Sequence, residues 1–253
     1  MNLYVLIGII CLIILIVVSF ILYDHRESFR ATTMDIKAAC LFAVSDFDAD
    51  DYQIVKDNSH DITFYIINNG LLTEYARKAA ALPLVTLDER ENTGWDLGAW
   101  KYGMEKYQNE LSRYDFVILA NNSCSYANNW KELLVDAIGY DMYGHSVNNL
   151  VESDKGPHLM TWFIIISKKL FNDPSFKAYF DNLKPTDRDY CILHHEARFT
   201  DHFKDKGFKV GIFAHTGKIG DTDSALKKKG RTPKMIDEHK KWARNYTPKY
   251  AYY

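Results

Sequence analysis

Strand-length apolar runs alternate with helical patterns through the middle of the chain. Four runs rich in β-branched and aromatic residues lie at residues 37–45, 61–68, 82–87 and 114–123. Good helix formers fill residues 72–81, and residues 96–111 repeat apolar side chains at spacings of three or four. Strands that alternate with helices predict an α/β fold in which helices cover both faces of a mostly parallel sheet.

The second half of the chain continues this pattern as far as residue 216. We expect strands at residues 141–146, 158–167 and 209–214, and helices at about 129–138, 175–182 and 189–206. One domain over residues 37–216 is the simplest organisation for a chain of 253 residues. The segment 217–253 is rich in Lys with Gly and Pro, so we expect it to lie on the surface or to be partly disordered.

The most apolar stretch of the sequence precedes this domain. Residues 3–23 hold no charged side chain, and their length matches the roughly 20 helical residues that cross a bilayer. A signal peptide is the alternative, but the apolar run is too long for one, no basic segment precedes it and no cleavage site follows. We therefore predict an uncleaved transmembrane anchor at residues 1–23, joined to the domain by a polar stem at residues 24–36.

The membrane orientation follows from weaker signals. Arg26 and Arg30 flank the predicted span on its C-terminal side, which favours a cytosolic catalytic domain by the positive-inside rule. Outside the span, three cysteines without close spacing suit reduced thiols better than disulfides. The triplets "NNS" at Asn121 and "NYT" at Asn245 are glycosylation sequons and argue for the opposite side. The sequence thus predicts a single-pass membrane protein, and the balance of these signals favours a cytosolic location of its domain.

Charge and aromatic content narrow the class of partner. The 31 basic and 33 acidic residues give a net charge of −2, which excludes an overall electrostatic footprint for nucleic acid. Aromatic residues make up 14% of the chain. Such a content fits an aromatic core, and it equally fits a cleft that stacks on nucleobases and sugars.

Polar residues follow each of the first four predicted strands. They are Ser45 and Asp46, then Asn68 and Asn69, then residues 90–96, and then residues 121–123. Because ligands of open α/β sheets bind at the carboxyl ends of the strands, we expect these residues to converge on one crevice.

The segment "ENTGWDLGAW" lies where the third strand turns into a helix. We expect Asn92 and Gly94 in the turn, and Asp96 as the cap of the helix. A glycine lets the backbone approach a ligand, and free amides at the start of a helix attract phosphate. An ordinary capped turn, with Trp95 and Trp100 in the core, is the alternative.

Other candidate groups carry less specific signals. The run "DFDADD" at residues 46–51 suits a solvated helix start, or a metal site of a hydrolase. Glu196 in "HHEARFTDHF" could deprotonate an acceptor hydroxyl with a pKa raised by burial, or lie on a solvated helix face. His158 could contact a phosphate or cap a strand. Histidines in this run lack the spacing of a zinc pair, and no nucleophile elbow, Walker loop or C-x-x-C pair is present.

Several segments in order resemble the rhamnan synthesis F family of glycosyltransferases. They are "ENTGWDLGAWKYGM", "YDFVILANNSCSY", "DMYGHS", "HLMTWFIIISKKLF" and "HHEARFTDHFKDKGFKVGIF". The resemblance covers roughly residues 60–215 and implies a GT-A-like fold, a nucleotide-sugar donor and a polysaccharide or glycan product. The matching positions are Asn92, Gly94, Asp96, Gly98, Trp100, Asn121, Asn122, Ser123, His158 and Glu196.

Two positions depart from the family pattern. Asn122 stands where the family tends to have Asp, and Thr161 where it tends to have Ser, so the second change keeps a hydroxyl. GT-A enzymes hold a divalent metal with an acidic pair at this strand end, whereas Asn121 and Asn122 offer only neutral amide oxygens. Mn²⁺ or Mg²⁺ is therefore a candidate cofactor with weak expected affinity, and Lys, Arg or backbone dipoles could neutralise the diphosphate instead.

The sequence thus predicts a membrane-anchored glycosyltransferase that moves a sugar from a nucleotide-diphosphate donor to a glycan hydroxyl. Glu196 is the predicted catalytic base, and Asn121 and Asn122 are the candidate metal ligands. The predicted donor-binding residues are Ser45, Asn68, Arg90, Asn92, Gly94, Asp96, Asn121, Asn122, Ser123 and His158. A non-catalytic glycan-binding or scaffold protein on the same fold, and a metal-dependent hydrolase using residues 46–51, are the alternatives.

Overall fold

The computed structural model describes residues 35–126, 130–147, 158–184, 197–216 and 226–228. Nearly all of these residues belong to the compact unit Lys37–Tyr253. In this described part of the chain, no helix has the length and apolar character needed to cross a bilayer. The predicted span at residues 3–23 and most of the stem lie outside it, so the membrane anchor stays a prediction.

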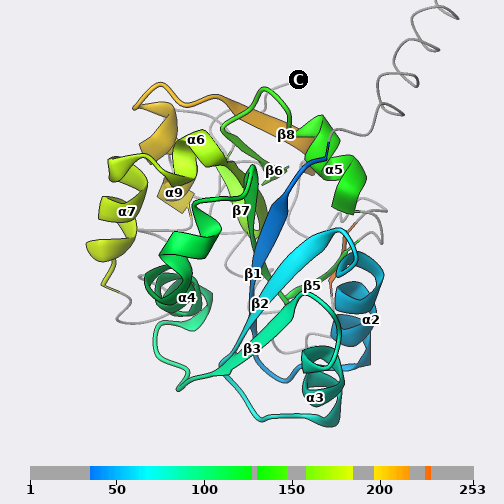
Figure 1. The fold of residues 1–253 in the computed structure, drawn as a ribbon. Helices are drawn as coiled ribbons and strands as arrows, with labels where there is room; N and C mark the ends of the chain where they lie inside the picture. Colours follow the sequence, from blue (N-terminus) through cyan, green and yellow to red (C-terminus); the bar gives the residue numbers. More distant parts are fainter. Residues whose placement is uncertain (1–34, 127–129, 148–157, 185–196, 217–225, 229–253) are drawn as a thin grey trace, which may run out of the picture. The chain divides into compact units, whose positions relative to one another are not determined.

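A seven-stranded sheet forms the centre of the unit (Figure 1). Its spatial order is β3 (Val85–Glu89), β2 (Ile62–Asn68), β1 (Ala38–Val44), β4 (Phe116–Asn121), β7 (His158–Ser167), β6 (Met142–Val147) and β8 (Val210–Thr216). All neighbouring strands pair in parallel except β7, which is antiparallel to both β4 and β6. The prediction of a mostly parallel sheet is confirmed, with one reversed strand.

The reversed direction of β7 determines which of its residues lie at the edge of the sheet where β1, β2 and β4 end. This edge is called the functional edge below. In the register of β7 with β4, Phe163 pairs with Ala120 and Ser167 pairs with Phe116. The first residues of β7 therefore extend beyond the carboxyl end of β4. His158 is brought in this way to the edge where β1, β2 and β4 end.

Helices cover both faces of the sheet, as predicted (Figure 1). The helices α2 (Ala49–Asn58), α3 (Glu74–Ala80) and α5 (Trp130–Asp136) lie on one face. The helices α4 (Trp95–Leu111), α6 (Lys168–Phe171), α7 (Pro174–Asp181) and α9 (Ala197–Lys204) lie on the other. A separate two-stranded sheet pairs β5 (Cys124–Tyr126) with β9 (Leu226–Lys228).

Aromatic side chains fill the space on both faces of the sheet. On one face the ring of Trp130 packs against Phe64 and Phe163, with centroids 5.5 and 4.9 Å apart. On the other face Phe176 and Phe203 lie in one cluster with α4 and the sheet. Large buried aromatic rings of this kind lower the free energy of the folded state through apolar burial and ring contacts. The aromatic core is thus confirmed as one reason for the high aromatic content.

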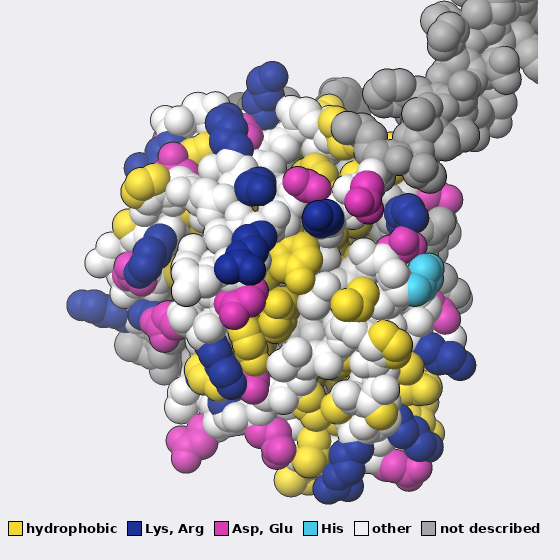
Figure 2. Space-filling model, in the orientation of Figure 1, with side chains coloured by type: hydrophobic (Ala, Val, Ile, Leu, Met, Phe, Trp, Pro, Cys, Tyr) yellow, Lys and Arg dark blue, Asp and Glu magenta, His cyan; other side chains and the backbone are white. Residues whose placement is uncertain are grey.

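The surface carries no dominant charge on the face shown in Figure 2. Acidic and basic side chains are interspersed there, with patches of hydrophobic side chains between them. This distribution agrees with the net charge of −2 and gives no continuous basic stripe on that face.

Candidate functional site

The ends of β1 and β4 are joined by the side chain of Asn122. Its Nδ2 donates to the backbone oxygen of Ser45 at 2.8 Å and to the carboxylate of Asp51 at 3.2 Å. Its Oδ1 accepts weakly from the backbone N–H of Ser45 at 3.4 Å. The residues after the first and fourth strands therefore meet, as the position of the strand ends predicts.

The start of α4 differs from its expected form. Gly94, with φ 78°, occupies the N-cap position, and no side chain caps the helix there. The expected cap by Asp96 is wrong, because Asp96 already lies in the first helical turn. A glycine tolerates the left-handed backbone at this turn, and no side chain of the N-cap residue binds the first amides of the helix.

Asp96 instead connects the loop to the end of β4. Its carboxylate accepts a hydrogen bond of 2.6 Å from Nδ2 of Asn121, whose own Oδ1 accepts from the backbone N–H of Ser123 at 3.0 Å. One helical turn later, the buried indole of Trp100 donates to the backbone oxygen of Ala120 at 3.2 Å. The loop after β3 and the end of β4 are therefore in direct contact, as a common candidate site requires.

Arg90 fixes the loop between β3 and α4. Its guanidinium donates to Oδ1 of Asn69 at 2.9 Å and to the backbone and hydroxyl oxygens of Thr93 at 2.8 and 2.7 Å. Asn69 in turn donates to the backbone oxygen of Trp95 at 3.3 Å. Partial burial lowers the pKa of Arg90, which still remains a cation at neutral pH. Three hydrogen bonds from its guanidinium thus set the position of the positive charge of Arg90.

Two other predicted residues contribute less directly. Asn68 is buried, and its amide bonds to the backbone oxygens of Gly70 and Leu71, so it shapes its own turn. Asn92 is exposed, and no hydrogen bond to it is found within the described residues. Asn92 is therefore available to a ligand, whereas Asn68 acts through the backbone.

The acidic run at residues 46–51 forms the start of α2. Asp48 is the N-cap, and with Asp51 it makes a capping box in which each carboxylate accepts from the backbone of the other. Asp51 is fully buried and also accepts from Asn122. These contacts support the helix-start interpretation over the hydrolase alternative. In the parts of the chain that the structure describes, no cluster of three or more His, Cys, Asp or Glu residues could hold a metal ion.

The side-chain oxygens of the two predicted metal ligands accept hydrogen bonds from within the protein. The amide oxygens of Asn121 and Asn122 both accept from backbone N–H groups, of Ser123 and Ser45 respectively. A hard cation needs several free oxygen ligands, usually including carboxylates. These residues do not form a ready-made cation site, and metal binding by them stays a prediction.

His158 lies at the functional edge as a neutral imidazole. Its side chain is buried, and burial lowers its pKa to about 4. The neighbouring Leu159 donates its backbone N–H to the hydroxyl of Thr200 at 2.8 Å, which connects α9 to the start of β7. Glu196, the predicted base, precedes the first residue of α9 and lies outside the described residues.

The buried imidazole predicts a pH-dependent stability. In the unfolded chain His158 has an ordinary pKa near 6.5, so between about pH 6.5 and 4 the unfolded state binds the additional proton. The free energy of unfolding should therefore fall as the pH is lowered through this window, and be unaffected by His158 above it. Unfolding followed by circular dichroism from pH 8 to 4 measures this, with His158→Gln as comparison. Equal slopes for both proteins in this window would contradict the prediction.

A segment of the C-terminal region lies beside the site. In the pairing of β5 with β9, Lys228 is opposite Cys124 and Lys227 is opposite Ser125. Because Cys124 directly follows Ser123, two lysines of the C-terminal segment are placed next to the end of β4. The sequence shows the run of lysines but gives no signal for this pairing.

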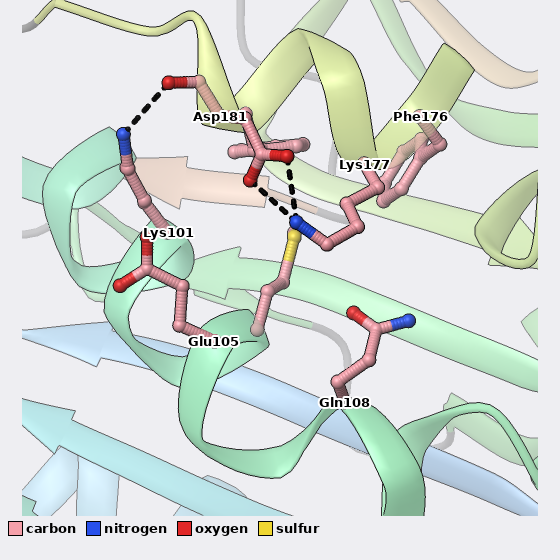
Figure 3. Close-up of a pocket in the computed structure, with 8 residues that line it drawn as sticks. Lys101, Glu105, Gln108, Phe176, Lys177 and Asp181 are labelled. Carbon is pink, nitrogen blue, oxygen red and sulfur yellow. Dashed lines mark hydrogen bonds and ion pairs between the residues drawn. The ribbon is translucent and has the colours of Figure 1, made fainter. Parts of the chain in front are cut away.

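A pocket lies away from these residues, between α4 and α7 (Figure 3). It has a volume of about 170 Å³ and an apolar wall that includes Phe176. Lys177 and Asp181 form an ion pair at its rim, and Lys101 donates to the backbone oxygen of Asp181 (Figure 3). None of the predicted site residues lines this pocket.

Comparison with known proteins agrees with the sequence motifs. The family described as rhamnan synthesis protein F matches residues 64–240. The chain belongs to the rhamnan synthesis protein F family. The match includes both site segments, the loop after β3 and the end of β4, and it extends past β9. No curated protein matches the chain.

Several solved structures align with this rhamnan synthesis F family member at low identity. HddC from Yersinia pseudotuberculosis aligns at 11% identity over 84% of this chain and 100% of that chain, with a TM-score of 0.46. A nucleoside-diphosphate-sugar pyrophosphorylase from Vibrio cholerae aligns at 11% identity over 82% and 99%, with a TM-score of 0.49. The glycosyltransferase GlyE of Streptococcus pneumoniae aligns at 10% identity over 69% of this chain and 44% of its own length, with a TM-score of 0.40.

Proposed function

We propose that this protein transfers a sugar from a nucleotide-diphosphate donor to a hydroxyl of a glycan or polysaccharide. The observation that carries the proposal is the hydrogen bond between Asp96 and Asn121, which joins the loop after β3 to the end of β4. Both segments lie where α/β sheets bind nucleotides, and both fall within the match to the rhamnan synthesis protein F family. The anchor at residues 3–23, with the domain in the cytosol, is part of the proposal; membrane fractionation tests the anchor, and protease protection tests the side of the domain.

The polar groups of this edge suit a diphosphate. The uncapped start of α4 offers backbone amides and the positive end of the helix dipole. Arg90 supplies a cation that is held in place by its hydrogen bonds to Asn69 and Thr93. These groups can neutralise the diphosphate without a metal. A bound divalent cation would supply further positive charge to the phosphates.

The proposed chemistry is a single displacement in which Glu196 is the base. The acceptor hydroxyl oxygen attacks the anomeric carbon, while the bond from that carbon to the diphosphate oxygen breaks. Glu196 takes the hydroxyl proton, and the electron pair of the broken bond leaves with the nucleoside diphosphate. A single displacement of this kind inverts the anomeric configuration.

A panel of donors tests the binding part of the proposal. The full chain in detergent is heated with UDP-, GDP-, CDP- and dTDP-linked sugars, each with and without Mn²⁺. A donor at 100 times its Kd should stabilise the folded state by about 2.7 kcal/mol, which corresponds to a rise in Tm of several degrees. The proposal would be contradicted if none of these donors raised the Tm, either with or without Mn²⁺.

A non-catalytic glycan-binding protein is the second candidate. It is favoured by the amide oxygens of Asn121 and Asn122, which are engaged inside the protein instead of facing a metal. Stabilisation by a donor without sugar transfer to any glycan acceptor, and without hydrolysis of the donor, would support this candidate over the transferase.

A further inference from the structure

Trp95 has a left-handed backbone and an exposed indole, and both features raise the free energy of the folded state. Its backbone has φ 50°, in the left-handed region that bulky residues avoid, directly after Gly94 with φ 78°. The residue is 39% exposed, whereas Trp100, five residues later on the same helix, is 1% exposed. Neither the conformation nor the exposure is explained by packing of the core. Backbone strain in a folded protein is concentrated at functional sites.

The surroundings of Trp95 hold it in this conformation. Asn69, at the end of β2, donates to the backbone oxygen of Trp95 and is itself bound by Arg90 from the end of β3. Gly98 lies so close to the loop that an added Cβ would be 2.1 Å from the backbone oxygen of Thr93. The loop is therefore fixed from two strand ends and from the helix.

The residue Trp95 is more than a third exposed. Within the described residues its indole makes no hydrogen bond and no contact with another aromatic ring. Trp95 is adjacent in the chain to Asp96, which contacts the end of β4. An exposed, flat aromatic ring is thus fixed at the rim of the proposed donor site.

We infer that Trp95 is the platform on which the base of the nucleotide donor stacks. The inference rests on the proposed function and adds to it the residue that recognises the base. With the diphosphate at the start of α4, the base and ribose extend from the same helix end that carries Trp95. Every nucleobase has a π face, so stacking contributes affinity for any base, and a planar base covers an indole better than a puckered sugar ring does.

Affinities for two kinds of probe separate stacking from phosphate binding. The full chain in detergent is titrated with UDP, GDP, CDP and dTDP, and separately with inorganic pyrophosphate. Trp95→Ala and Trp95→Gly should weaken the best nucleoside diphosphate by roughly 5- to 150-fold, the range that loss of one stacked base produces. Pyrophosphate affinity should stay within about twofold, because it has no base to stack. Trp95→Phe should retain most of the nucleotide affinity.

Two variants serve as controls. Glycine adopts left-handed φ without strain, so Trp95→Gly removes the ring and keeps the backbone conformation. Tyr140→Ala removes an aromatic side chain of similar exposure, 41%, from a position outside the site, and should not alter nucleotide affinity.

Fluorescence gives a second measurement. Among the tryptophans that the structure describes, only Trp95 is exposed, while Trp100, Trp130 and Trp162 are at most 5% exposed. Nucleoside diphosphates should therefore quench the emission of the wild type, and the quench should be lost in Trp95→Phe although the nucleotide still binds.

The outcomes distinguish this inference from the function on which it rests. Unchanged nucleotide affinity in Trp95→Ala and Trp95→Gly would overturn the inference alone. An equal loss of pyrophosphate affinity would also overturn it, because Trp95 would then act only by shaping the loop. Failure of every nucleoside diphosphate to bind the wild type would overturn the proposed function together with the inference.

Discussion

Replacing Glu196 with glutamine is expected to lower turnover by about 10²- to 10⁴-fold, the contribution typical of a positioned general base. Glutamine has the same shape but cannot accept the proton of the acceptor hydroxyl. Glu196 directly precedes α9 in the sequence, and the hydroxyl of Thr200 in α9 accepts from the backbone N–H of Leu159 at the start of β7. Sugar transfer and donor affinity are measured on the same preparation, and donor affinity should be unchanged.

A second Glu→Gln variant controls for the loss of one negative charge. Glu105 is exposed on α4 and makes no hydrogen bond within the described residues. Glu105→Gln should leave turnover within about twofold of the wild type, since a lone exposed charge contributes little. Normal turnover in Glu196→Gln would remove Glu196 from the mechanism, while a loss of donor affinity in it would assign the residue to binding.

The order of strands and helices was predictable because the sequence of a buried strand is a continuous run of apolar residues. The predicted runs at residues 37–45, 61–68 and 114–123 contain β1, β2 and β4. The third strand was placed too early, at residues 82–87 instead of Val85–Glu89. It lies at the edge of the sheet and includes the polar residues Asp88 and Glu89, so its apolar run ends before the strand does.

The direction of β7 and the bounds of α2 were not predicted. Nine consecutive buried residues in β7 indicate burial on both faces, but the pattern is the same for parallel and antiparallel neighbours. The acidic run at residues 46–51 was interpreted as a helix start or a metal site, without bounds for a helix. A signal was available there, since Asp48 followed by Asp51 has the spacing of a capping box.

The position of the candidate site could be predicted from the sequence, but the hydrogen bonds within it could not. The rule that strand ends converge brings Ser45 and Asn122 together, as observed. The role of Asp96 was misjudged because Asp is a preferred cap, whereas here Gly94 occupies that position and Asp96 binds Asn121. The strand β9 depends on pairing with a distant segment, and local sequence carries no information on such a pairing.

Replacing Gly98 with alanine is expected to destabilise the protein by about 3 kcal/mol and to abolish donor binding. Alanine gains up to about 1 kcal/mol in helix propensity over glycine. The clash outweighs this gain, because the new Cβ would lie 2.1 Å from the backbone oxygen of Thr93. To relieve it, the loop must move away from α4, and the hydrogen bonds of Arg90 to Thr93 and Asn69 are lost with it.

Gly103→Ala in the same helix is the matched control. It gains the same helix propensity, but its Cβ would meet the end of the flexible Leu41 side chain at 2.8 Å, which can shift. Thermal unfolding and donor titration of both variants in detergent should show a large loss on both measures for Gly98→Ala, and a small effect on stability alone for Gly103→Ala. Normal donor affinity in Gly98→Ala would mean that the donor does not depend on the loop after β3. The contact between Asp96 and Asn121 would then hold the fold together without forming the binding site.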